Sequence, residues 1–565
     1  MNVSRLPVIS FILAILLLPG CRSTKWHVKK ADKEAGSIIT QYQQEALGKT
    51  GKFTIERPSD SLRKRLMIEQ DLPGYGNVAS SNKMSGAGKP LQIKLLDALQ
   101  IGARHNRNYQ SRKEDVFRTA LDLDLSRAEF RNSYSGLLSA MLSGDEGGES
   151  ASRSVGGEAS AGVTRKFQTG VSFAGKLGID LVKLLTMDKT STLGMLADAT
   201  ISVPLLRGAG RDIVREPLTQ AERDVIYAMW SFERFKRSFA VRMAGEYFGA
   251  LEQAKQIQNA EANLKSLTDA RQRMQELAKA GRQPETQVDQ ARQDELRANS
   301  RLIAARQLYE ASLDSLKMSI GIPVDAKIEL DKEELTRLSE TTAGTFSDKV
   351  AIAEDGAKKT EEAVLKALKN RLDLRAAYWA LEDTQRKLNV ARDALDAEMK
   401  LKLSASTRDT HTSGLSETKT DVKFGDVKYG AVLDVGLPWD RTAERVAFRK
   451  SMIALEAMAR QVEEQEDSIK QEIRSAVRKL IELEETYRIQ RQAVELAERR
   501  VNSTEIFLQA GRSQIRDVLE AQEDLVSARD ALVSAIVSYH MASLGLQRDL
   551  ELLEINEEGM WASHE

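Results

Sequence analysis

The sequence has little of what a compact enzyme or a disulfide-rich secreted domain needs. Its 565 residues include one cysteine and five histidines, and only 5% are aromatic. A single cysteine forms no internal disulfide, and the histidines are scattered without the spacing of metal ligands. Because few aromatic residues are combined with 29% charged residues, the composition is typical of long, solvent-flanked helices rather than of several globular cores.

A surplus of one charge is also missing. The 83 Lys and Arg residues balance 83 Asp and Glu residues, and without a basic surplus we expect no nucleic-acid partner. Gly208-Ala209-Gly210 lacks the lysine and the serine or threonine that follow in a phosphate-binding loop. No catalytic constellation stands out, so we predict that the protein is not an enzyme and that it has no cofactor and no metal site.

The N-terminal apolar run is too short to hold the mature protein in a bilayer. Residues 6–18 reach about 20 Å as a helix, whereas a hydrocarbon core is roughly 30 Å thick. The run follows Arg5 and leads into Leu18-Pro19-Gly20-Cys21, which indicates a cleaved secretory signal. These four residues resemble a bacterial lipobox, so we expect lipidation at Cys21. The alternative is a chance cysteine beside an ordinary cleavage site.

Two halves of the chain resemble each other. Ala280-Gly281-Arg282 and Ala510-Gly511-Arg512 lie 230 residues apart. The stripes that follow them agree at six of seven positions: Val288, Ala291, Glu295, Ala298, Leu302, Ala305 and Tyr309 against Val518, Ala521, Leu525, Ala528, Leu532, Ala535 and Tyr539. Asn106-Arg107 and Asn370-Arg371 match at a spacing of 264 residues. We interpret the pattern as a duplication in which the first copy carries a longer insertion.

Each half shows the same order of expected elements. After helices at about 93–133 and 360–397, the apolar period changes from 3.6 to 2, which predicts strands. Prolines, Pro204 and Pro438, end the two hairpins. Helices of about 65 residues follow, from about residue 216 to 280 and from 442 to 509. Each would span roughly 100 Å, longer than a single globular core.

Four alternating strands are too few to close a barrel alone, and an open sheet edge is not viable in lipid. We therefore expect several copies to combine into a membrane barrel with an outer apolar face and an inner polar face. The alternative is a soluble pair of hairpins packed on the helices.

At this point the chain resembles the TolC-like outer membrane efflux protein family, over roughly residues 90–550. The repeated plan of elements, the two strand-ending prolines and the stretch from Gly511 to Ala521 carry the resemblance. That stretch looks like the family's periplasmic helical tip, a glycine turn followed by aspartate, valine and leucine. The first copy departs from it, since Gln283-Pro284-Glu285-Thr286-Gln287-Val288 lacks the aspartate.

The resemblance implies a homotrimer in which each chain lends four strands to a twelve-stranded barrel and four helical strands to a periplasmic tunnel. The helical turns would form an aperture that meets a periplasmic adaptor, itself joined to an inner membrane pump. The implied aperture residues are Gly281, Arg282, Gly511, Arg512, Ser513, Arg516, Asp517 and Glu520. Asp517 and Glu520 match acidic aperture positions of the family, with Arg512 and Arg516 as candidate partners. The alternative is that these are ordinary solvated charges of a coiled coil.

The predicted fold class is mainly α with a small β part: a long α-helical coiled-coil barrel joined to a transmembrane β-barrel, with two tandem repeats per chain. The expected segments are a lipoprotein signal peptide (1–20), a lipid-anchored arm or linker (21–90), a first repeat (91–321, strands about 163–182 and 192–203), an inter-repeat linker (322–357), a second repeat (358–549, strands about 399–407 and 427–437) and a C-terminal tail (550–565).

The predicted function is the exit duct of a tripartite efflux or type I secretion system, which passes substrate passively from the periplasm to the exterior. The expected location is the outer membrane, with lipid, sister chains, adaptor and pump as partners. A periplasmic adaptor or coiled-coil scaffold lipoprotein is the alternative. An adaptor carries one helical hairpin flanked by compact β domains, whereas this sequence predicts two hairpins and long strands. The sequence leaves the cargo open among drugs, metal ions, siderophores and secreted proteins.

Overall fold

The structure is a computed structural model. The chain forms two compact units. The structure describes residues 23–48, 51, 53, 55, 62–70, 90–145, 152–184, 191–347, 356–413, 427–437, 439–510 and 512–556. Unit 1 comprises residues 1–50, 116–229 and 376–462, and unit 2 comprises residues 51–115, 230–375 and 463–565. Each unit is described by itself.

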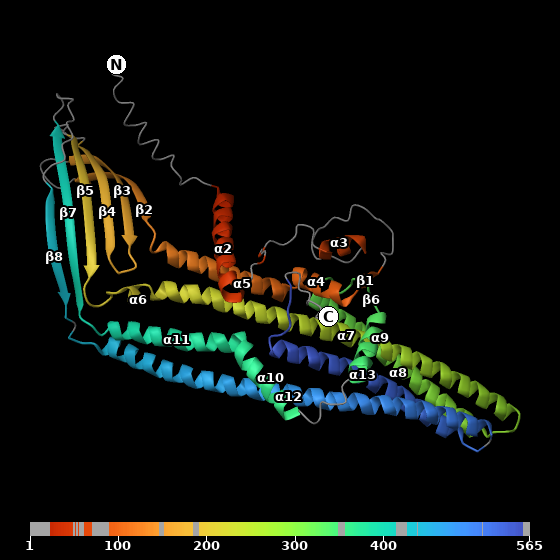
Figure 1. The fold of residues 1–565 in the computed structure, drawn as a ribbon. Coiled ribbons are helices and arrows are strands. Elements are labelled where there is room, and N and C mark those ends of the chain that lie inside the picture. The colour runs from red at the N-terminus through yellow and green to blue at the C-terminus, as the bar shows by residue number, and fades with distance from the viewer. Residues whose placement is uncertain are drawn as a thin grey trace. The chain divides into compact units, whose positions relative to one another are not determined.

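Unit 1 contains an antiparallel sheet that has six strands among the described residues. The strands are β2 (Ser133–Asp145), β3 (Ser152–Lys166), β4 (Ser172–Leu184), β5 (Ser191–Pro204), β7 (Glu398–Ser413) and β8 (Lys428–Gly436). They lie side by side in the order β2-β3-β4-β5-β7-β8 (Figure 1). Strands β2 and β8 are therefore the two edges of the sheet.

The sheet has one apolar and one polar face. The register places Tyr134 opposite Val163, Leu177 opposite Ala197, and Leu403 opposite Ala431. Because side chains alternate along a strand, most apolar side chains of the six strands share one face, although Arg165 also lies on it and some apolar residues lie on the opposite face: Leu137, Met141, Leu196 and Val432. The other face carries serine, threonine, glycine and charged residues: Glu158, Lys166, Lys176, Asp198, Glu398, Lys400, Lys402, Lys428 and Asp434.

The prediction of one hairpin in the first repeat is wrong, because the strand expected at about 163–182 is two strands. Strand β3 ends at Lys166 and β4 begins at Ser172. Between them, Gly170 has a φ of +93° and its N–H donates to the Phe167 carbonyl at 3.0 Å. A Cβ at Gly170 would lie 2.9 Å from the carbonyl oxygen of Gly208. This tight glycine turn interrupts what alternation alone predicts as one strand.

The hairpin β2–β3 corresponds to no element that the sequence predicts. The described sheet therefore has six strands in place of the four that the sequence predicts. Its residues are mostly glycine, serine and alanine, which have weak strand propensity and give a faint apolar alternation. The unequal spacings of the two internal matches, 264 and 230 residues, make the first half longer by 34 residues. The hairpin from Ser133 to Lys166 has that length, and it accounts for the difference.

The long helices have the bounds that the sequence predicts. Helix α7 is Glu216–Lys279 and α12 is Thr442–Gln509, and each is followed by a shorter helix, α8 (Glu285–Ile320) or α13 (Ile515–Asp549). Pro217 lies in the first turn of α7, where its missing N–H is not needed. The remaining helices of this part of the chain are α5 (Arg107–Ala128), α6 (Arg211–Val214) and α11 (Leu372–Asp393).

Each helix expected ahead of the strands is broken in two. Helix α4 (Leu95–His105) is separated from α5 by Asn106, and α10 (Gly356–Asn370) is separated from α11 by Arg371. Asn106 is 9% exposed, and its Oδ1 accepts from the Tyr109 N–H at 2.8 Å, capping α5. Its Nδ2 donates to the Ser319 carbonyl at 2.6 Å. A short polar side chain that caps one helix and binds another segment fixes the break.

Unit 2 contains an extensive apolar core. Tyr109 is 2% exposed and lies among three phenylalanine rings, with centroid distances of 5.2 to 5.8 Å. The segments expected to be linkers add to this unit. The inter-repeat linker contains β6 (Ile328–Leu330), parallel to β1 (Leu91–Ile93), and α9 (Glu333–Ser347). Leu553 and Ile555 of the predicted tail are buried in the same core.

The N-terminal arm is not extended throughout, because its described part contains helices. These are α2 (Thr24–Leu47) in unit 1 and α3 (Leu62–Glu69) in unit 2. In α2 the buried residues are Ala35, Ile38, Ile39 and Tyr42. That spacing places them on one helical stripe, and burying the stripe stabilises a helix in a segment of mixed composition.

Candidate functional site: the helical turns and the polar face of the sheet

The turn between α7 and α8 in unit 2 is built by a glycine. The Gly281 N–H donates to the Ala278 carbonyl, and the Arg282 N–H donates to the Leu277 carbonyl, both at 2.9 Å. This Schellman pattern needs a left-handed residue, and Gly281 supplies it with a φ of +70°. No atom lies within 4 Å of the position that a Cβ of Gly281 would take. The position therefore favours glycine because of its left-handed backbone conformation, and not because neighbouring atoms would clash with a side chain.

The turn between α12 and α13 has a similar exit and a different start of the next helix. The Arg512 N–H donates to the Phe507 carbonyl at 2.8 Å, while Gly511 lies outside the described residues. At the start of α13, Asp517 accepts from the Ser513 hydroxyl at 2.7 Å and from the Gln514 N–H at 3.0 Å. At the start of α8 the N-cap position is Pro284, which makes no side-chain hydrogen bond to the helix. The aspartate thus gives the second turn a cap that the first lacks.

The cap makes the second turn sensitive to acid. The hydrogen bonds from Ser513 and Gln514 lower the pKa of Asp517 below its usual 3.8. The cap is therefore fully formed above that value, and its contribution is lost as the pH falls through the lowered pKa.

We expect Asp517→Asn to reduce hydrogen-exchange protection in the first turn of α13 at neutral pH, because the neutral amide is a weaker acceptor for the two donors. The difference from the unchanged chain should shrink as the pH falls below 3.8 and through the lowered pKa of Asp517, where its carboxyl group becomes protonated. Exchange followed by mass spectrometry measures both. Asp524→Asn, on an exposed acid of the same helix, is the control and should leave the first turn unchanged. Equal loss in both variants would contradict the capping role.

The expected partners of Glu520 need correction. Within the described residues, Glu520 pairs with Arg500 of α12 at 3.1 Å, and the same guanidinium also pairs with Asp524. Within the same described residues, Arg512 and Arg516 form no ion pair with Glu520, and Arg516 acts on Asp517 as a nearby positive charge that helps to lower its pKa. The reason is geometric, since Arg500 lies on the antiparallel helix opposite Glu520. The sequence offers no spacing signal for a pair 20 residues apart.

A small apolar cluster underlies the two turns. Its buried members are Leu267, Met274, Ala291, Ala298, Ile515, Val518 and Leu519, from α7, α8 and α13. Several of the alanines and valines are those of the matching stripes, so these stripes face the interior of unit 2. The small side chains allow close approach of the helices.

In unit 1, the polar face of the sheet carries charges in pairs. Lys176 lies 3.1 Å from Glu158, Lys402 lies 2.6 Å from Asp434, and Lys400 pairs with Glu398. Pro204 ends β5 on this face, opposite Lys400 in the register. Pro438 and Cys21 lie outside the described residues. The charges on the described polar face nearly balance, because five lysines oppose four carboxylates.

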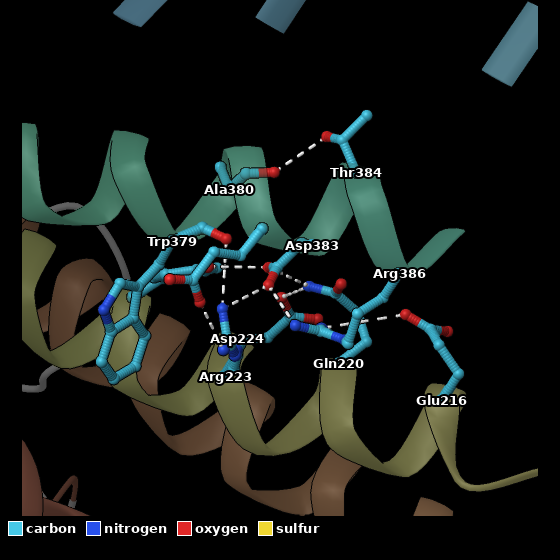
Figure 2. Close-up of polar contacts among 11 residues, drawn as sticks. Glu216, Gln220, Arg223, Asp224, Trp379, Ala380, Asp383, Thr384 and Arg386 are labelled. Atoms are coloured by element: carbon cyan, nitrogen blue, oxygen red, sulfur yellow. Dashed lines mark hydrogen bonds and ion pairs between the residues drawn. The ribbon is translucent and has the colours of Figure 1, made fainter. Parts of the chain in front are cut away.

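A buried polar cluster joins α7 to α11 in unit 1. Asp383 is 3% exposed and accepts from Arg223 at 2.7 Å, Arg386 at 2.8 Å and the Tyr227 hydroxyl at 2.7 Å. Figure 2 shows the side chains of Arg223 and Arg386 directed at Asp383, with Gln220 beside them. Burial and the hydrogen bond to Asp383 raise the pKa of Tyr227. The cluster links a helix of the first half of the chain, α7, to a helix of the second half, α11. The sequence analysis did not predict this link.

No described helix is both long and apolar enough to cross a membrane. Nor do the residues that the structure describes contain a group of three or more His, Cys, Asp or Glu side chains placed to hold a metal ion.

A family model supplies the decisive comparison. Residues 363–550 match the model described as outer membrane efflux protein. The chain carries an outer membrane efflux protein domain. Comparison with curated proteins gives no match. The efflux protein domain covers α10 to α13 with β7 and β8, which is most of the second predicted repeat.

Solved structures extend the likeness to the first half of the chain. The outer membrane protein VceC from Vibrio cholerae is 14% identical, with 81% of this chain and 95% of that chain covered and a TM-score of 0.57. The open state of the Neisseria gonorrhoeae MtrE outer membrane channel is 14% identical, with 81% of this chain and 88% of that chain covered and a TM-score of 0.55. CusC, whose structures concern folding and transmembrane channel formation, is 13% identical, with 85% of this chain and 98% of that chain covered and a TM-score of 0.56. At these identities the likeness establishes the fold.

Proposed function

We propose that the protein is the outer membrane exit channel of a tripartite efflux or type I secretion system. Its substrate would pass through unchanged, from the periplasm to the exterior. The observation that carries the proposal is the six-stranded sheet, which has one mainly apolar face, one mainly polar and charged face and, among the described strands, two edges without a neighbour. Leu177 is 59% exposed and Leu433 is 56% exposed on the apolar face. Such a face suits lipid, and such edges must be paired before the sheet can enter it.

The partners follow from the same geometry together with the efflux protein domain. Three copies would close the sheet into a barrel, since one chain cannot. The helical turns at Gly281 and Arg512 would form the periplasmic end, where an adaptor joined to an inner membrane pump would dock. Acylated Cys21 would anchor the N-terminus in the outer membrane. The adaptor alternative is not favoured, because a soluble adaptor gains nothing from a sheet with an exposed apolar face.

Two neighbouring residues of β8 offer a direct test. Leu433 lies on the apolar face and Val432 on the polar face, and they are 56% and 51% exposed. We expect Leu433→Arg to block membrane insertion, because arginine in lipid costs about 2–4 kcal/mol at the midplane. Val432→Arg should insert normally.

Outer membrane fractionation, heat-dependent gel migration of the oligomer and conductance across a planar lipid bilayer provide the measurements. The unchanged protein should migrate as a heat-sensitive trimer and conduct ions. Equal tolerance of both arginines, in a protein that remains in the soluble periplasmic fraction, would exclude the channel and support the adaptor.

A further inference from the structure

We infer that three copies close a barrel of eighteen strands, in which β2 of one copy pairs with β8 of the next. We further infer that the outer conduit takes hydrophilic cargo of larger cross-section than a twelve-stranded barrel admits. The inference rests on the proposed trimeric channel. It differs from what the family resemblance implies, because the resemblance supplies four strands per chain.

The hairpin β2–β3 is part of the wall and not an appendage. Strand β2 pairs with β3 from Ser133 to Asp145, and β3 pairs with β4 from Ser154 to Lys166. Strand β4 therefore has neighbours on both sides, β3 and β5. Its backbone groups are already paired, so β4 cannot also serve as the joint to another copy. Among the described strands, β2 and β8 are the two that have a neighbouring strand on one side only.

The two edges match each other in direction. Every neighbouring pair in the sheet is antiparallel and the sheet has an even number of strands. Strands β2 and β8 consequently run in opposite directions. Rotation about an axis along the barrel places β2 of one copy antiparallel to β8 of the next, and the alternation continues around the ring. A second copy of this chain is thus a suitable partner for each edge.

The faces also continue to both edges. On the apolar side, β2 presents Tyr134 and Leu142, each 76% exposed, and β8 presents Tyr429, which is 89% exposed. A lipid-facing surface explains apolar side chains left this open at the edges. On the opposite side, the six described positions of β2 that point inward are two apolar residues, Leu137 and Met141, and four serines: Ser133, Ser135, Ser139 and Ser143. The added hairpin therefore extends both surfaces of the wall.

The added strands widen the barrel. With neighbouring strands about 4.8 Å apart and tilted by about 40°, eighteen strands give a backbone diameter of about 36 Å, against about 24 Å for twelve. The cross-section is then roughly twice as large. Small inward residues of β3, such as Gly156, Ser160 and Gly162, leave that space open. Small drugs do not need such a width, so we assign the conduit to bulky hydrophilic solutes or polymers.

Cysteine cross-linking tests the joint between copies, since Cys21 is the only natural cysteine. Tyr134→Cys in β2 is combined in turn with a cysteine at each outward position of β8: 429, 431, 433 and 435. At least one combination should give a covalent trimer after mild oxidation, whereas the single variants should not. In the matched control, Leu177→Cys in β4 is combined with the same β8 cysteines in place of Tyr134→Cys. Cross-linking of β4 to β8, or none from β2 in a conducting trimer, would overturn the eighteen-stranded barrel.

Polymer exclusion tests the width. Polyethylene glycols of graded size, added at the outer side of the channel in a planar bilayer, enter the barrel up to a limiting radius. Deleting residues 133–166 leaves four strands, again an even number, and should reduce the limiting radius about 1.5-fold. An unchanged radius would contradict the inference alone, whereas the absence of any conductance in the unchanged protein would contradict the proposed channel. If the deletion variant fails to assemble, the cross-links still decide.

Discussion

Replacing Asp383 with alanine is expected to lower the free energy of unfolding by about 3–5 kcal/mol, the cost of removing one partner from a buried ion pair. The Asp383 side chain is 5% exposed, and it accepts from two guanidinium groups and the Tyr227 hydroxyl. Without the carboxylate, Arg223 and Arg386 lose the negative charge between them. Little water reaches the position to replace it, so the loss is not offset by hydration.

Urea unfolding followed by tryptophan fluorescence measures this effect. The Arg223 guanidinium lies 4.8 Å from the centre of the Trp379 ring, so the indole reports the integrity of the cluster. The control is Glu382→Gln at the neighbouring position. Glu382 binds the same Arg223 at 2.9 Å, but its side chain is 60% exposed. A solvated pair contributes about 0–1 kcal/mol, so equal effects of the two substitutions would show that burial of Asp383 does not matter.

The second large effect is expected at Gly321, the left-handed residue that ends α8. Its φ is +80°, and a Cβ there would lie 2.4 Å from the carbonyl oxygen of His105 and 3.1 Å from the Asn106 nitrogen. Both are backbone atoms of the break between α4 and α5, so neither can rotate away. We expect Gly321→Ala to cost about 2–4 kcal/mol, from the unfavourable φ together with displacement of packed backbone.

Gly281→Ala provides a matched control for Gly321→Ala. Gly281 ends α7 with a similar φ of +70°, yet nothing lies within 4 Å of its Cβ position. The same substitution should therefore cost only about 1 kcal/mol, the conformational part alone. Thermal unfolding of the two variants gives the comparison. If Gly281→Ala is as destabilising as Gly321→Ala, the close approach to His105 contributes nothing and the argument from packing is wrong.

The helical part of this protein is largely determined by local sequence. The predicted bounds of α7 and α12 agree with the structure because helix periodicity and termination act within a few residues. The turn at Gly281 is likewise readable, since a glycine between two helical stripes supplies the left-handed residue of the Schellman pattern. The capping role of Asp517 also depends on neighbours within four residues. These features need no knowledge of distant segments.

The strands show where local pattern stops being sufficient. The prediction of β5, β7 and β8 succeeded because their apolar and polar residues alternate clearly. In β2 the large apolar residues do not alternate with polar ones, since Leu137-Leu138 and Met141-Leu142 are adjacent, so the hairpin β2–β3 is defined only by its pairing with β4. The turn at Gly170 divides a seemingly continuous alternation, because its glycine lies against Gly208 of another segment.

By itself, the sequence determined the long helices, the glycine turns and the existence of an alternating sheet, because each depends on interactions between near neighbours. Only the tertiary structure decided the number of strands, the pairing of Glu520 with Arg500 and the convergence of Arg223 and Arg386 on Asp383. The Glu520–Arg500 pair joins residues 20 positions apart, and the Arg223–Asp383 pair joins residues 160 positions apart. Such contacts follow from how helices and strands pack, and local residue patterns do not encode them.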